Sequence, residues 1–313
     1  MTLEFYDIVK SDDIQVSIPE NSHFTVGTSP YYAHQHGLAI DIYHSLLLEN
    51  YNVFSPISGI IQEIKTVRAP KPKFVGGIDK DFLILVKNLV NHNIIYKIMH
   101  VKSKLHVGDK IEIGDLLGKT IRNGYFAYWS SPHLHLEIRS FQDAIRARGG
   151  KDFTLAFESR ETFDIQGEIC EFTKIPIEIH ASYPEFILCR FSRSFYHKIA
   201  PIYGIKVRIY KSDYILDGGI PHYKFGTVIS DQLYDTKSFK SIYLGTSKIG
   251  TLDKVKEQFG FFKFDPVKFF LNDKEIRGIS LYLAHFFPLI KIIPYYKSDF
   301  LFKAKSTQYL SIV

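Results

Sequence analysis

The sequence has few cysteines and no long apolar run. It contains Cys170 and Cys189 among 313 residues, and without C-x-x-C spacing they supply neither a disulfide framework nor a cysteine-based zinc or redox site. We expect two buried thiols, with one disulfide between them as the alternative. No stretch reaches the ~18 uninterrupted apolar residues of a membrane span. The first residues lack the basic and apolar regions of a secretory signal, so we expect a cytoplasmic protein.

Clusters of charge are also missing. The formal net charge is +6, from 39 Lys and Arg against 33 Asp and Glu, and the basic residues are spread along the chain. A nucleic-acid-binding domain usually gathers them on one face, so we predict no nucleic-acid partner. The composition, with 45% hydrophobic and 15% aromatic residues, excludes a mostly disordered chain. The length suits two domains.

Short runs of alternating or β-branched residues dominate both halves, so the expected fold class is mostly β. The clearest strands of the first half are expected at residues 39–43, 59–65, 82–87, 94–101 and 134–139. Those of the second half are expected at residues 175–180, 205–210 and 276–283, with turns at 217–219 and 245–250.

Two helices are expected as exceptions. The first follows Ser140, because Ser140 and Asp143 have the spacing of a capping box and two glycines at 149–150 would end the helix. We place the domain boundary there, which gives domains 1–150 and 151–313. The second helix is expected around residues 252–259.

Alternation is strict in the segment 131–139, which reads SPHLHLEIR. On a strand, His133, His135 and Glu137 share one face, and the apolar residues between them share the other. Two imidazoles ~7 Å apart on one face suit a metal site, because one can ligate while its neighbour handles protons. An H-x-H pair alone is a weak indication, because histidines also occur on strands for structural reasons.

A second polar segment begins at His34 and reads HQHGLAID. On a strand Asp41 would share a face with Gly37 and Ala39, whose small size leaves space above them. A carboxylate with histidines just upstream can supply two of the three protein ligands of a catalytic zinc. The structural alternative is a polar turn in which Asp41 accepts backbone N–H groups. Another histidine, His100, ends the strand-like run YKIMH.

Together these segments resemble the lysostaphin/LytM-type zinc metallopeptidases, whose catalytic core is a small antiparallel β-sheet groove. The resemblance covers most of the first half, and its elements occur in the family's order. They are HQHGLAID at 34–41, FSPISGII at 54–61, YKIMH at 96–100, VGDKIEIGDLLG at 107–118 and PHLHLE at 132–137.

One segment departs from the lysostaphin pattern H-x-G-x-D, because Gly37 stands where that histidine is expected. It instead follows H-x-x-G-x-A-x-D, as in the related D-Ala-D-Ala metallopeptidases, and this pattern favours His34 over His36. The resemblance therefore implies one Zn²⁺ per chain, bound by His34 or His36, Asp41 and His135, with water in the fourth position.

The resemblance also implies that His100 and His133 stay off the metal, orient the attacking water and stabilise the oxyanion. The implied activity is hydrolysis of peptide bonds in a peptide or peptidoglycan-like substrate. Residues 151–313 resemble no named family and are expected to modulate substrate access. Two alternatives remain: a non-catalytic binding scaffold on the same fold, and a lipoyl- or biotinyl-type carrier. The carrier is disfavoured because its Met-Lys-Met or Asp-Lys-Ala tripeptide is missing.

Overall fold

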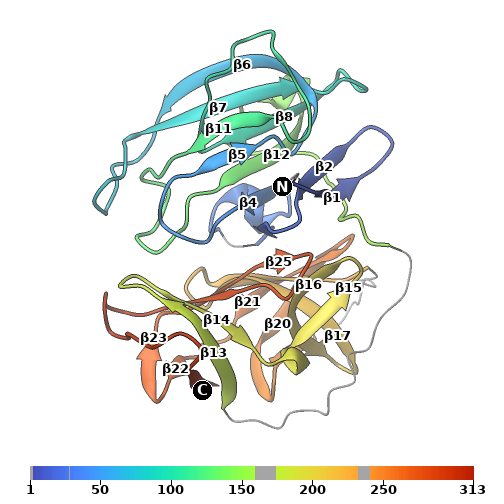
Figure 1. Ribbon diagram of the computed structural model, residues 1–313. Coiled ribbons are helices and arrows are strands. Elements are labelled where there is room, and N and C mark those ends of the chain that lie inside the picture. Colours follow the sequence, from blue (N-terminus) through green and yellow to red (C-terminus); the bar gives the residue numbers. More distant parts are fainter. Residues whose placement is uncertain (1–2, 28, 159–173, 232–239) are drawn as a thin grey trace. The chain divides into compact units, whose positions relative to one another are not determined.

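Strands make up nearly all of the regular structure in the computed structural model of the chain (Figure 1). The predicted mostly β fold class is therefore confirmed. Within the described part of the chain, no helix has the length and apolarity needed to cross a membrane. The residues that the structure describes are 3–27, 29–158, 174–231 and 240–313.

Two compact units divide the chain, and each combines segments that are separate in the sequence. Unit 1 comprises Met1–Phe24 and Tyr32–Ala156, and unit 2 comprises Thr25–Tyr31 and Phe157–Val313. The short strand β3 (His23–Thr25) contains the first crossing between them. Of the two cysteines, Cys189 is a free, buried thiol, whereas Cys170 lies outside the described residues.

Unit 1 is built on one antiparallel sheet with strand order β10-β6-β7-β8-β12-β4. The bounds of these strands are Lys110–Ile111 (β10), Gly59–Arg68 (β6), Lys80–Lys87 (β7), Ile94–Met99 (β8), Leu134–Ser140 (β12) and Ala39–Tyr43 (β4). A hairpin and a three-stranded sheet complete the unit: β1 (Phe5–Lys10) with β2 (Gln15–Pro19), and β5 (Asn52–Phe54) with β11 (Leu116–Thr120) and β9 (Val101–Lys102).

Strand β12 lies between β4 and β8 and is buried on both faces. Leu134, Leu136 and Ile138 lie on one face and are at most 1% exposed. The other face holds His135 and Glu137, which are also buried. The alternation read from the sequence thus becomes one hydrocarbon face and one polar face on a central strand.

The helix predicted after Ser140 is wrong. The structure has a single 3₁₀ turn there, Phe141–Asp143, and Ser140 makes no side-chain cap. Asp143 instead accepts hydrogen bonds from Arg139 Nη1 at 2.9 Å and from Gly150 N at 3.1 Å. The acidic residue that suggested a capping box therefore fastens the following loop to β12.

The helix predicted at 252–259 is also wrong. These residues belong to β20 (Ser247–Lys256) and to the start of β21 (Phe259–Phe264), which form a hairpin. The pairing register shifts between Leu252 and Lys254. This irregularity interrupts the alternation of apolar and polar residues, which is the signal that identifies a strand in a sequence.

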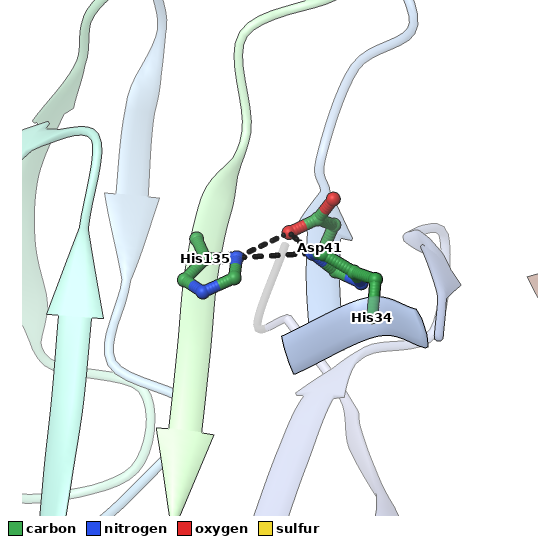
Figure 2. A group of neighbouring side chains, drawn as sticks. All are labelled: His34, Asp41 and His135. Carbon is green, nitrogen blue, oxygen red and sulfur yellow. Dashed lines mark hydrogen bonds and ion pairs between the residues drawn. The ribbon is translucent and has the colours of Figure 1, made fainter. Parts of the chain in front are cut away.

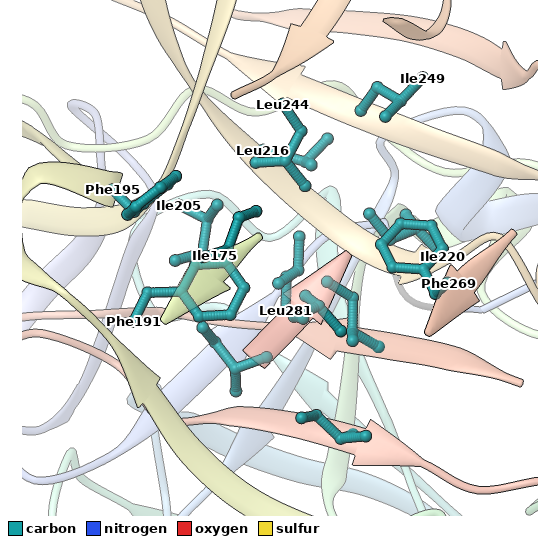
Figure 3. Close-up of a cluster of buried hydrophobic side chains, with 14 of the residues drawn as sticks. Ile175, Phe191, Phe195, Ile205, Leu216, Ile220, Leu244, Ile249, Phe269 and Leu281 are labelled. Atoms are coloured by element: carbon teal, nitrogen blue, oxygen red, sulfur yellow. The ribbon is translucent and has the colours of Figure 1, made fainter. Parts of the chain in front are cut away.

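Unit 2 contains a closed six-stranded antiparallel barrel and a second antiparallel sheet. Successive pairings close the barrel in the order β16-β17-β18-β21-β20-β19-β16. The second sheet has the order β23-β22-β27-β13-β14-β26-β24-β17. A large apolar cluster fills this unit (Figure 3).

Unit 2 also contains the short strands β15 and β25 and a 3₁₀ turn. Their bounds, with those of the barrel and second sheet, are Ile175–Ser182 (β13), Ile187–Phe191 (β14), Arg193–Phe195 (a 3₁₀ turn), Tyr196–Ile199 (β15), Ile202–Ile209 (β16), Ser212–Ile220 (β17), Phe225–Ile229 (β18), Ser241–Leu244 (β19), Phe269–Leu271 (β22), Lys274–Ile276 (β23), Gly278–Leu281 (β24), Leu283–Ala284 (β25), Ile290–Ile293 (β26) and Thr307–Ile312 (β27).

The turn predicted at 217–219 is a bend inside strand β17. Asp217 pairs with Thr227 in the barrel, and the next residue, Gly218, pairs with Leu281 in the second sheet. Gly218 has φ 133, a value that residues with a side chain rarely adopt. Glycine therefore allows one strand to serve both sheets.

Asp217 also holds the N-terminal segment of unit 2. Its Oδ1 accepts a hydrogen bond from Thr25 Oγ1 at 2.6 Å, and its Oδ2 accepts from Val26 N at 2.7 Å and Gly27 N at 2.8 Å. The Asp217 side chain is fully buried. Residues 25–27 are thus fixed to β17 by a single carboxylate shortly before the chain returns to unit 1.

Candidate metal centre

The register of the unit 1 sheet places an acid opposite a histidine. Asp41 on β4 pairs directly with His135 on β12. Facing residues on adjacent antiparallel strands have neighbouring side chains, and here His135 Nδ1 lies 2.8 Å from Asp41 Oδ1. Both side chains are buried.

The third member, His34, comes from the one-turn helix α1 (Tyr32–Gln35), which precedes β4. Gly37 ends this turn with φ 64, and the bonds Gly37 N to His34 O and Leu38 N to Ala33 O form a Schellman-type C-cap. The prediction that Gly37 lies on the strand face with Asp41 is therefore wrong. Its role is to reverse the chain so that the helix lies next to the strand.

Three potential ligand atoms, one from each residue, converge at this point (Figure 2). His34 Nε2 lies 3.2 Å from both His135 Nδ1 and Asp41 Oδ1. Tetrahedral ligands at zinc bond lengths of ~2.0–2.1 Å would lie about 3.3 Å apart. The donor set is therefore already close to the spacing that a zinc ion requires, and these three residues could hold a metal.

The other candidate histidine is directed elsewhere. His36 is half-buried, its Nδ1 lies 2.8 Å from Tyr32 O, and its ring stacks on the Tyr32 ring at 4.1 Å. The structure therefore brings His34, and not His36, to Asp41 and His135.

Electrostatics in the cluster favour a cation. Burial opposes ionisation of Asp41, but electrostatic interactions with His133 and His34 and hydrogen bonds from His135 and His34 hold the pKa of that carboxyl well below its ordinary value. Burial likewise disfavours charge on His135, yet its bonds to Asp41 and Glu137 raise its pKa to about 9. Without metal, a proton on His135 thus occupies the place between acceptors that a metal ion would take.

Glu137 determines which nitrogen of His135 faces the cluster. His135 Nε2 lies 3.0 Å from Glu137 Oε1, and because a carboxylate only accepts, this nitrogen carries a hydrogen. Nδ1 is consequently left for Asp41 and His34. A ligand histidine that donates its second N–H to a carboxylate is the usual outer-shell arrangement of a metal site.

Two buried cations in turn hold Glu137. Lys97 Nζ donates to Glu137 Oε1 at 3.1 Å, and Arg139 Nε lies 2.8 Å from Glu137 Oε2. Burial raises the pKa of Glu137, but His135, Lys97 and Arg139 outweigh it and bring the pKa to about 2. The sequence pattern gave no indication of Lys97 and Arg139, because a charged residue on a strand ordinarily indicates a solvent-exposed face.

His133 approaches the same carboxylate from the other side. Its Nε2 lies 3.4 Å from Asp41 Oδ2, while its Nδ1 lies 3.0 Å from Ser131 O. Burial lowers the pKa of His133 to about 4, despite the opposing effect of Asp41. His133 is therefore a neutral imidazole at pH 7, with Nδ1 donating to the carbonyl and Nε2 unprotonated.

His100 completes the histidine group, although the backbone there differs from the prediction. The predicted strand 94–101 is interrupted at His100, which has φ 68 between β8 and β9. The ring centroid of His100 lies 5.4 Å from that of His133 and 5.8 Å from that of His135. The irregular backbone thus places the ring beside the cluster.

A buried acid, Asp81, contacts His100 and was not among the predicted site residues. Asp81 Oδ2 lies 2.7 Å from His100 Nδ1, and Asp81 Oδ1 accepts the backbone N–H of His100 at 3.0 Å. Burial opposes ionisation of Asp81, but the charge and hydrogen bonds of His100 lower its pKa. Its sequence context, the start of a strand after a Gly-rich loop, gave no signal of this contact.

Aromatic rings flank the two histidines that are not in the three-residue cluster. Phe126 lies 4.9 Å, centroid to centroid, from both His100 and His133. Tyr43 lies 4.7 Å from His133, and Tyr125 lies 6.1 Å from His100. The sequence pattern gave no indication that these rings lie beside the histidines.

Fold and site together define a two-unit β-protein with a buried His-Asp-His group in its first unit. Two family models match the chain: the domain of unknown function (DUF8155) N-terminal domain at residues 14–155, and the C-terminal domain of the same family at residues 199–300. No curated protein matches. Among solved structures, the NMR solution structure of lysostaphin matches with 16% identity and a TM-score of 0.25, over 79% of this chain and 95% of that chain.

Proposed function

We propose that this protein is a zinc-dependent metallo-endopeptidase that hydrolyses peptide bonds, with cell-wall-type peptides as the expected substrate class. The observation that carries the proposal is the convergence of His34 Nε2, Asp41 Oδ1 and His135 Nδ1 to within 3.2 Å of one another. Two histidines and one carboxylate are a common protein ligand set of catalytic zinc. The sequence resemblance to lysostaphin-type peptidases supports the substrate class.

Each residue of the cluster has a distinct role in the proposed reaction. Asp41, His34 and His135 would hold the ion, and a zinc ion bound there would act as a Lewis acid that makes water acidic enough to attack at neutral pH. His133 is neutral at pH 7, and its Nε2 takes a proton from the attacking water. His133 returns that proton to the amine nitrogen as the peptide C–N bond breaks. His100, whose ring lies beside the cluster, helps to stabilise the negative charge that develops on the carbonyl oxygen.

Iron is the main competing metal, because two histidines and one carboxylate also form the ligand set of non-haem iron oxygenases. The features that favour zinc and hydrolysis are His133 and His100, whose rings lie beside the cluster and can transfer protons. Elemental analysis of the freshly purified protein, covering zinc, iron and manganese, tests this choice. We expect one zinc per chain, and stoichiometric iron would contradict the proposal.

The activity test is cleavage of a peptide library that includes Gly-rich and D-amino-acid-containing cell-wall peptides. We expect cleavage by the zinc-loaded protein, loss after chelation and recovery on adding zinc. His133→Ala should keep stoichiometric zinc and lose ~10²–10⁴ in turnover, because it removes one positioned proton-transfer group. Zinc binding without any cleavage would favour the alternative function, a non-catalytic binding scaffold on the same fold.

A further inference from the structure

We propose that Asp81 is the positioning residue of His100: it fixes the tautomer in which Nδ1 carries the hydrogen and Nε2 is the reactive nitrogen. This inference rests on the proposed function for its catalytic consequence. Its structural content, a defined tautomer of one histidine, can be tested without any activity.

The contacts of Asp81 determine how its carboxylate can act. Oδ1 accepts two backbone N–H groups, that of His100 at 3.0 Å and that of Phe82 at 2.8 Å. Oδ2 lies 2.7 Å from His100 Nδ1, a separation that an unprotonated ring nitrogen and a carboxylate oxygen, both acceptors, would not keep. Asp81 is fully buried and His100 is 7% exposed, so water competes little for this pairing.

The backbone of His100 depends on the same carboxylate. A φ of 68 is uncommon for a residue with a side chain, and such a conformation persists only where the surroundings determine it. Asp81 fixes both the N–H and the ring of His100. The acid therefore controls where the ring lies as well as which of its nitrogens is protonated.

The tautomer has a direct chemical consequence. With Nδ1–H directed to Asp81, a neutral His100 has its lone pair on Nε2, which can accept a proton. When a proton from solvent occupies Nε2 before the attack, the carboxylate stabilises the resulting imidazolium, which can donate Nε2–H to a developing oxyanion. The same division of roles holds in serine proteases, where a buried acid orients a histidine and replacing it by the amide fixes the wrong tautomer.

Asp81→Asn tests the inference sharply, because the protein fixes the orientation of the amide. The two backbone N–H donors require the amide oxygen at the Oδ1 position. The NH₂ group then faces His100 Nδ1, which must become the acceptor, so the hydrogen moves to Nε2. The exposed neighbour Asp79 supplies the matched control, Asp79→Asn.

The primary measurement is ¹⁵N NMR of the histidine rings, with the His100 signals identified by their loss in His100→Gln. In the wild-type protein we expect Nδ1 to be the protonated nitrogen of neutral His100, in Asp79→Asn likewise, and in Asp81→Asn we expect Nε2. A wild-type His100 protonated on Nε2 would overturn the inference, even if Asp81→Asn failed to fold.

The second measurement separates this inference from the proposed function. In zinc-loaded protein, Asp81→Asn should keep stoichiometric zinc and KM while kcat falls, because a neutral Nε2–H is a weaker donor to the oxyanion than the imidazolium that the carboxylate stabilises. The fall should not exceed that in His100→Ala, and the double variant should match His100→Ala. Unchanged kcat with the shifted tautomer would overturn the catalytic role of Asp81. A wild-type protein that cleaves no peptide refutes the proposed function, while the NMR result still decides the tautomer.

Discussion

The two units bury different kinds of side chain on their sheets. In unit 1, the polar face around β12 buries Lys97, His135, Glu137 and Arg139. Unit 2 contains a large cluster of buried side chains, most of them Ile, Leu, Val and Phe (Figure 3). Replacing buried ion pairs by apolar residues is often neutral or stabilising. The charged face of unit 1 is therefore hard to explain by stability and is expected where a sheet holds a reactive site.

The largest contrast should come from removing a proposed ligand. His135→Ala leaves two protein ligands. We expect its zinc affinity to fall by more than ~100-fold, the most that is usually lost when a residue that only hydrogen-bonds a metal ligand is replaced. His36→Ala, whose ring stacks on Tyr32, should retain stoichiometric zinc. Metal content after dialysis against a weak chelator measures both. Retention by His135→Ala, or loss in His36→Ala, would refute the ligand assignment.

The next largest effect should occur in unit 2, without any change in metal binding. Asp217→Ala removes the acceptor of three hydrogen bonds and leaves buried N–H groups unsatisfied, so we expect a loss of about 3 kcal/mol or more in unfolding free energy. Asp213→Ala on the same strand breaks only the partly exposed pairs with Arg208 and Lys206, and should cost within ~1 kcal/mol.

Chemical denaturation followed by circular dichroism measures these losses. The single tryptophan, Trp129, belongs to unit 1, so its fluorescence reports the unfolding of that unit separately. If the Asp217→Ala protein is as stable as the Asp213→Ala protein, the carboxylate does not hold the segment as described.

A smaller effect is expected from Glu137→Gln. It keeps the size of the side chain but weakens the acceptor of His135 Nε2–H and removes the partner charge of Lys97 and Arg139. We expect zinc affinity to fall ~10–100-fold, as for other outer-shell carboxylates. Competition with a chromophoric chelator measures it, and Glu112→Gln on the surface is the control. Equal affinities in the two variants would show that Glu137 is merely structural.

Metal binding should also depend on pH. In the metal-free protein the pKa of His135 is raised from 6.5 to about 9, so zinc must displace a proton below that value. Apparent zinc affinity should rise about tenfold per pH unit from 6.5 and level off near 9. Isothermal titration in buffers of different ionisation enthalpy should show about one proton released at pH 7.5. A pH-independent affinity would refute this account.

The same shift predicts the opposite trend for the metal-free fold. A raised pKa means that protonated His135 stabilises the folded state fully below pH 6.5, and this contribution is lost as pH rises through about 9. The Trp129 unfolding transition should therefore weaken with rising pH in the absence of zinc and not in its presence. In unit 2, burial lowers the pKa of His222 from 6.5 to about 3, so this residue makes the fold less stable as pH falls below 6.5, which is the opposite trend.

Period-two alternation was sufficient to predict the strands that carry the site. The residue pairs His135–Glu137 and Leu134–Leu136 lie on the faces that the sequence indicates. Predictions failed where a side chain had a tertiary partner that the local pattern does not reveal. Asp143 binds Arg139 and Gly150 in place of a helix N-terminus. In β20, a register shift hides the alternation.

The contact between Asp81 and His100 could not be predicted, because it joins a strand start to a strand interruption 19 residues away through a positive φ. Conversely, the pattern H-x-x-G-x-A-x-D gave the location of Asp41 and pointed to His34 without revealing why Gly37 is needed. Glycine there ends a helix. From the sequence alone, a glycine that is needed for its backbone conformation cannot be distinguished from one that is needed because it has no side chain.

The anchoring of residues 25–27 by Asp217 also sets an order of events during synthesis. The carboxylate is translated about 190 residues after Gly27, which at ~5–20 residues per second is an interval of about ten to forty seconds. During that interval this stretch emerges from the ribosome without its acceptor, seven residues ahead of His34. A truncated chain ending near Gly150 would never contain Asp217, so residues 25–27 would stay without this acceptor. Unit 2 is therefore needed to fix residues 25–27 in their observed place.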